Sequence, residues 1–123
     1  MKPGEVVIKN PDVLRSLMEY RFEPIRVSIV IYIANKHGII ITEGYRVKKH
    51  RNDLHGTIPV RAIDIRSWVY PDTKVYRIMT AVNNKWEYDF KRPNKKTMIV
   101  HDVGRGIHAH IQCSPNTRLR SIT

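Results

Sequence analysis

TMIVHDVGRGIHAHIQ, residues 97–112, contains two runs rich in β-branched residues separated by Gly-Arg-Gly. A short glycine-containing connection of this kind is typical of a hairpin, so the segment predicts antiparallel strands over 97–103 and 107–112. In the second strand Ile107, Ala109 and Ile111 alternate with His108 and His110, and side chains two residues apart share a face. The hairpin therefore predicts an apolar face toward a core and a pair of imidazoles on the other face.

Outside the hairpin, periodicity predicts helices over 12–20, 25–36 and 71–83, and strands over 39–42 and 60–68. Asp12 is the expected N-cap of the first helix, and Pro71-Asp72 opens the third. Residues 25–36 also alternate like a strand, but Gly38 behind them favours a helix with a glycine cap. An irregular loop is expected over 44–57 and a turn-rich connector over 91–96.

These elements predict a small α+β domain with a mostly antiparallel sheet, and 123 residues fit a single domain spanning 1–123. The 41% hydrophobic content is that of a globular protein, and no run approaches the roughly 20 apolar residues of a membrane span. The first residues, Met-Lys-Pro-Gly-Glu, lack the apolar core of a signal peptide. We therefore expect synthesis in the cytoplasm, without a signal peptide and without a membrane span.

The charge balance is strongly basic, with 22 Lys and Arg against 11 Asp and Glu. A formal charge of +11 favours association with polyanions, whether nucleic acid or an anionic envelope. Aromatic residues are only 8% of the chain and no known nucleic-acid motif is present, so a nucleic-acid partner is the less favoured interpretation. Phosphate contacts would then fall to Lys48, Lys49, Arg51, Lys95 and Lys96.

Asp64 lies inside the apolar strand Ala-Ile-Asp-Ile, where an unpaired carboxylate would cost several kcal/mol. A salt bridge to Arg61, Arg66 or another base is one way to compensate its charge. Metal ligation is the other, because the loop bearing His55 can fold back over the end of this strand. With Cys113 as the single cysteine, a metal site would have to rest on histidine and carboxylate.

Three stretches together resemble a known family. Thr42-Glu43-Gly44-Tyr45-Arg46 resembles the Thr-Ser-Gly-Tyr-Arg element of the D-alanyl-D-alanine metallopeptidases, and residues 55–64 resemble their Ser-X-His-X-X-Gly-X-Ala-X-Asp signature. His108-X-His110 resembles the closing strand of the same group, which includes zinc endolysins, lysostaphin-like enzymes and the hedgehog signalling domain. The resemblance implies a hedgehog-like fold with helices packed on one face of the sheet.

The resemblance also implies a site. His55, Asp64 and His110 would bind one zinc ion, and Arg46 would hold the substrate carbonyl oxygen or carboxylate. It implies hydrolysis of an amide bond in peptidoglycan stem peptides, as in carboxypeptidases or endolysins. The small size resembles phage-encoded members, which act on the bacterial cell wall.

The chain departs from the family at two points. The first histidine and the aspartate are nine positions apart instead of seven, with Ile58-Pro59 as an apparent inserted bend. The carboxylate expected three residues before the last zinc histidine is replaced by Ile107.

By analogy with the lysostaphin-like relatives, His108 would transfer the proton, with His101 as a second imidazole, while Asp102 and Glu87 are alternative bases. The missing carboxylate leaves a second interpretation open. It is a zinc-retaining or metal-free pseudoenzyme that binds a peptide or a protein.

Overall fold

The computed structural model describes residues 1–71, 73–102 and 106–120, except for the side chain of Asp102. The major sheet contains five strands in the order β1-β2-β3-β6-β5. Its strands are β1 (Val6–Ile8), β2 (Ile39–Glu43), β3 (Ala62–Ile65), β6 (Ile107–Gln112) and β5 (Met98–Asp102). The helices are α1 (Pro11–Glu19), α2 (Pro24–His37) and α3 (Lys74–Lys85), with a short 3-10 turn, η1 (Leu54–Gly56). A second sheet pairs β4 (Trp86–Glu87) with β7 (Arg118–Leu119).

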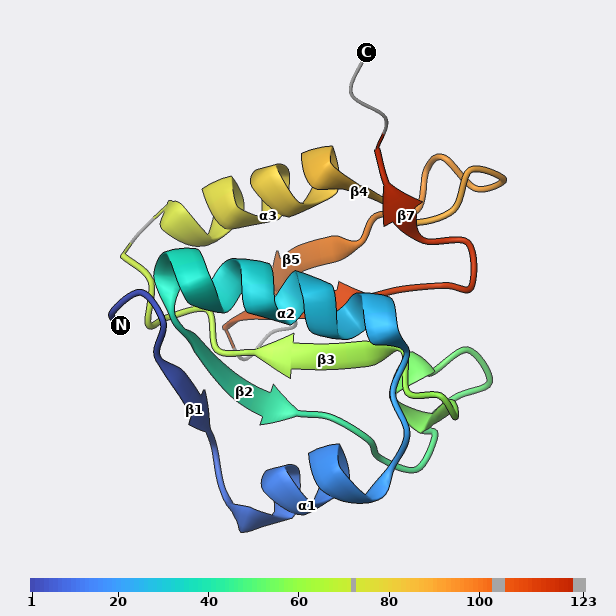
Figure 1. Ribbon diagram of the computed structural model, residues 1–123, viewed down its shortest axis with the longest axis horizontal. Coiled ribbons are helices and arrows are strands. Elements are labelled where there is room, and N and C mark those ends of the chain that lie inside the picture. Colours follow the sequence, from blue (N-terminus) through green and yellow to red (C-terminus); the bar gives the residue numbers. More distant parts are fainter. Residues whose placement is uncertain (72, 103–105, 121–123) are drawn as a thin grey trace.

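The major sheet is mostly antiparallel, as the sequence predicts. Only β1 and β2 run parallel, whereas β2–β3, β3–β6 and β6–β5 are all antiparallel pairs. Helices α2 and α3 lie against one face of this sheet, and α1 lies near the ends of β1 and β2 (Figure 1). The α+β class is therefore confirmed.

Alternation along the strands separates a buried face from a face free of these two helices. Ile63 and Ile65 of β3 and Ala109 and Ile111 of β6 are at most 3% exposed and pack into the core. The helices contribute Ile29, Ile33 and Ala34 from α2 and Val75, Ile78 and Val82 from α3. Because side chains alternate, the polar residues between these strand positions face the opposite side of the sheet. Asp64 is one of them.

The helix preferred for residues 25–36 is confirmed as α2. Pro24 occupies its first turn, and Gly38 caps its end with φ +73°, a conformation that favours glycine. The N-cap expected for α1 is wrong, because Asn10, not Asp12, accepts a hydrogen bond from the Val13 amide. The third helix begins at Lys74, later than expected, and Asp72 lies outside the described residues.

The predicted hairpin is present as β5 and β6, which pair from Met98↔Ile111 to Asp102↔Ile107; residues 103–105 of its turn lie outside the described chain. One detail is wrong, since Ile107 is 42% exposed and does not join the core. The strand over 60–68 is confined to β3. Four short elements were not predicted from the sequence: β1, β4, β7 and the η1 turn, each only two or three residues long.

In the part of the chain that the structure describes, none of the helices combines the length and apolar character needed to cross a bilayer.

Candidate metal centre

His55 is held from two sides by the loop that carries it. Asp53 caps η1 by accepting a hydrogen bond from the His55 amide at 3.1 Å. The ring itself is 1% exposed, and its Nδ1 lies 2.7 Å from the carbonyl oxygen of Gly44. A backbone hydrogen bond from Arg46 N to His55 O, at 3.1 Å, ties the same two segments together. The imidazole therefore has a fixed direction, with Nε2 aimed at the sheet.

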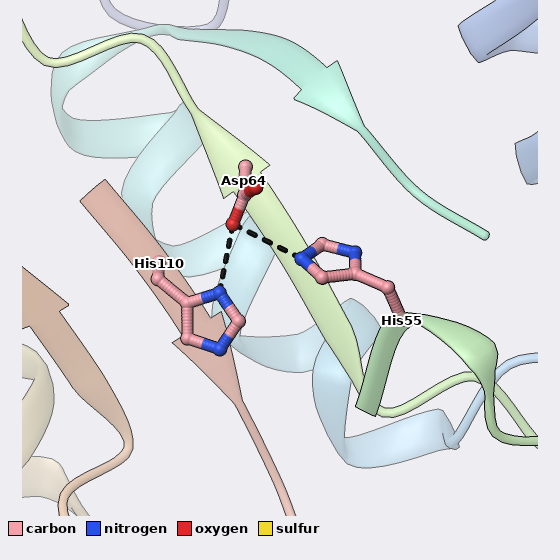
Figure 2. A group of neighbouring side chains, drawn as sticks. All are labelled: His55, Asp64 and His110. Carbon is pink, nitrogen blue, oxygen red and sulfur yellow. Dashed lines mark hydrogen bonds and ion pairs between the residues drawn. The ribbon is translucent and has the colours of Figure 1, made fainter. Parts of the chain in front are cut away.

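Asp64 and His110 are brought together by strand register. They are paired residues on the antiparallel strands β3 and β6, and both lie on the face away from α2 and α3. The Asp64 Oδ1 lies 2.7 Å from His110 Nδ1 and 3.2 Å from His55 Nε2. Figure 2 shows the two rings reaching this oxygen from different elements, one from β6 and one from η1. The nine-residue separation of His55 and Asp64 therefore does not keep them apart.

The three residues form a group within metal-binding distance. One nitrogen from each histidine and one Asp64 oxygen all lie within 4.8 Å of one another. A tetrahedral zinc ion with bonds of about 2.0–2.1 Å separates its ligands by roughly 3.3 Å, so small side-chain shifts would let the group close on an ion. Three protein ligands leave a fourth position for water or substrate, which is the pattern of catalytic zinc sites.

The hydrogen bonding of His55 is compatible with a bound cation. A carbonyl oxygen only accepts, so Nδ1 must carry the proton that is donated to Gly44. In a neutral ring Nε2 then presents its lone pair to the Asp64 carboxylate at 3.2 Å, and two acceptors would repel each other. The arrangement is favourable with a second proton on the buried ring or with a cation between the two acceptors. Carbonyl groups commonly orient metal-binding histidines in this way.

Asp64 is stabilised as a carboxylate. Burial alone would raise the pKa of Asp64, but its contacts with His110 and His55 hold that pKa well below its usual range. An ionised Asp64 is the form that binds a metal ion.

Arg46 joins the group through contacts that the sequence did not predict. Its guanidinium lies 2.8 Å from Glu43, 3.2 Å from Asp53 and 3.9 Å from Asp64. Asp53 is 3% exposed; burial alone would raise the pKa of Asp53, but amide hydrogen bonds and the Arg46 charge lower it. Gly44, two residues before Arg46, permits the close approach of α1, because a Cβ there would lie 2.8 Å from the Leu17 side chain. Glu43 and Asp53 were not predicted to position Arg46, although Glu43 lies within the stretch from Thr42 to Arg46 that carries the family resemblance.

The group opens into a groove of about 1140 Å³, whose lining includes Asp64 and His110 on the sheet face away from α2 and α3. His101 and His108 are exposed, lie opposite each other on β5 and β6, and line this groove, but they are not part of the three-residue group. Of the alternative bases, Glu87 lies on β4, pairs with Arg118 and Arg120, and is not among the residues that line the groove. The side chain of Asp102 lies outside the described part of the structure.

A scan against protein-family models found no match, and searches of curated proteins and of solved structures found none either.

Proposed function

We propose that the protein is a zinc-dependent peptidase of the D-alanyl-D-alanine metallopeptidase and zinc endolysin type, which hydrolyses an amide bond in peptidoglycan stem peptides. The observation that carries the proposal is the convergence of His55, Asp64 and His110 within 4.8 Å, beside Arg46 and an open groove. The order of these residues along the chain is also the order in the family that the sequence resembles. Action on the bacterial cell wall, as by a phage-encoded enzyme, follows from the same proposal.

In this mechanism His55, Asp64 and His110 would hold the ion. When bound, zinc lowers the pKa of a coordinated water to about 7 and polarises a carbonyl group. The Gly44 carbonyl keeps the His55 ring in one tautomer and one orientation, so Nε2 stays available as a ligand. Arg46, fixed by Glu43 and Asp53, supports the negative charge that develops on the scissile carbonyl oxygen.

His108 is the proposed proton carrier. It shares the groove-facing side of β6 with His110, two residues away. An imidazole is suited to accept a proton from the attacking water at neutral pH and to deliver it to the leaving amine. His101, opposite His108 in the hairpin, is the proposed second imidazole.

Hydrolysis of purified muropeptides, followed by mass spectrometry of the products, tests the proposal. The zinc-loaded protein should release peptide fragments, and His110→Ala should abolish this release. His37→Ala is a matched control, since His37 lies at the end of α2, outside the groove lining. Absence of products from wild-type protein carrying zinc would contradict the proposed activity.

The alternative is a pseudoenzyme that keeps the ion and binds peptide. The presence of Ile107, exposed and without a carboxylate, three residues before His110 favours it. Peptide binding without turnover by the zinc-loaded protein would select this alternative.

A further inference from the structure

A second group of nitrogen-bearing side chains lies beside the metal group. Asp64 and Arg66 are two residues apart, as are His110 and His108, and His101 is the cross-strand partner of His108. All five residues line the same groove. The chain from Asp64 to Arg66, just past the end of β3, therefore leads from the metal ligands to a second set of side chains. This set, formed by Arg66, His108 and His101, offers only nitrogen groups.

Arg46 and Arg66, the arginines that line the groove in the described part of the chain, lie toward opposite ends of β3. Because β2 runs antiparallel to β3, the segment that leads from Glu43 to Arg46 continues toward the start of β3. Arg66 instead follows the end of β3, where its amide bonds to Ile40 O at 2.9 Å. A substrate lying along β3 over Asp64 would thus have one arginine toward each end.

Only one of these arginines is neutralised by neighbouring acids. Arg46 contacts Glu43 and Asp53 at 2.8 and 3.2 Å. Among the side chains that the structure describes, no carboxylate lies within 4.0 Å of the Arg66 guanidinium. Of Arg46 and Arg66, Arg66 is therefore the one whose charge is not paired with a described carboxylate.

Arg66 is also held in place by its surroundings. Its guanidinium lies 4.8 Å from the ring centroid of Trp68, a cation–π contact. Between them, the Ser67 hydroxyl donates a 2.6 Å hydrogen bond to Ile107 O and so fixes this turn to β6. Trp68 is 74% exposed, which leaves an indole face for an apolar part of a ligand. An oriented guanidinium beside an exposed aromatic ring is suited to a carboxylate on an organic ligand.

We infer that Arg66 and Trp68 form a subsite for a carboxylate of the peptide substrate, and that Arg66 determines specificity. Two residues of a strand span about 6.6–7 Å, a length that also covers two residues of an extended peptide. The recognised carboxylate accordingly lies within two residues of the scissile bond, on the side toward the end of β3. This inference rests on the proposed peptidase function and specifies its substrate.

A set of synthetic stem peptides tests the subsite, each peptide having one carboxylate replaced by its carboxamide. Wild-type protein loaded with zinc should lose about 10- to 100-fold in kcat/KM with one of these peptides, mainly through KM, as expected for a charged hydrogen bond. Arg66→Gln should show the same loss with the parent peptide and no further loss with that carboxamide. Arg77→Gln, the same charge change on the exposed side of α3, should behave as wild type.

Equal effects of each carboxamide on wild type and Arg66→Gln would overturn the subsite, while leaving hydrolysis and therefore the proposed function intact. If wild-type protein with zinc cleaves none of the peptides, the proposed activity fails, and calorimetric binding of the same peptides then decides the subsite. Weaker binding of one carboxamide to wild type, absent in Arg66→Gln, supports it. Equal affinities, or no binding, overturn it.

Discussion

Replacing Asp64 with asparagine removes the carboxylate on which both histidines converge and keeps the shape of the side chain. In metal-free protein the main loss is the 2.7 Å charge-assisted hydrogen bond from His110. Hydrogen bonds to charged groups contribute about 1.5–3 kcal/mol, and Asp64 is only 21% exposed, so little of this is lost to solvent screening. We expect Asp64→Asn to lower the free energy of unfolding by about 2 kcal/mol at pH 7.

The pH dependence of this difference follows from the lowered pKa of Asp64. The unfolded carboxyl titrates near 3.9, so the stabilisation is fully present above about pH 4–5 and is lost as pH falls through the lower pKa of the folded state. Urea unfolding of wild type and Asp64→Asn with a chelator present, from pH 7 down to pH 2.5, measures the difference in their unfolding free energies. Asp12→Asn, in an exposed ion pair, is the control. Equal stability of Asp64→Asn and wild type at pH 7, or a gap that does not narrow as the pH falls toward 2.5, would refute the reasoning.

Three further predictions concern the surroundings of the site. Asp53→Asn should lower the unfolding free energy by about 1–3 kcal/mol in urea titrations, because Asp53 is buried and accepts from two amides and Arg46. Gly56→Ala should lower the unfolding midpoint and weaken zinc binding, since its Cβ would collide with the Lys48 side chain and lie 2.8 Å from the Lys48 amide nitrogen. Burial raises the pKa of Cys113 to about 12, so iodoacetamide at pH 8 should label it only in urea, as mass spectrometry would show.

The parts of the site that follow from strand periodicity were predictable. Alternation in β6 placed His108 and His110 on one face, and a carboxylate inside an apolar strand indicated that Asp64 needs a partner. These inferences depend only on the two-residue repeat of a strand. The register that pairs Asp64 with His110 depends on long-range packing, and it was reached only through the family resemblance.

The contacts that the loop over residues 44–57 makes in the site could not be predicted from periodicity. Residues 44–57 lack periodicity, so nothing local indicated that Asp53 would cap η1 and also contact Arg46. The signal that was available is a capping residue, Asp53, two positions before His55. Short strands such as β4 and β7 are likewise defined by their partners rather than by a pattern of their own. The N-cap of α1 was misassigned because Asn10 and Asp12 are both good capping residues.

The zinc content of protein purified without a histidine tag, measured by inductively coupled plasma mass spectrometry after dialysis, tests the metal centre most directly. We expect about one zinc ion per wild-type chain and almost none in His55→Ala, which loses a ligand of a three-residue site. Wild-type protein that retains no zinc, or His55→Ala that retains as much as wild type, would contradict this expectation.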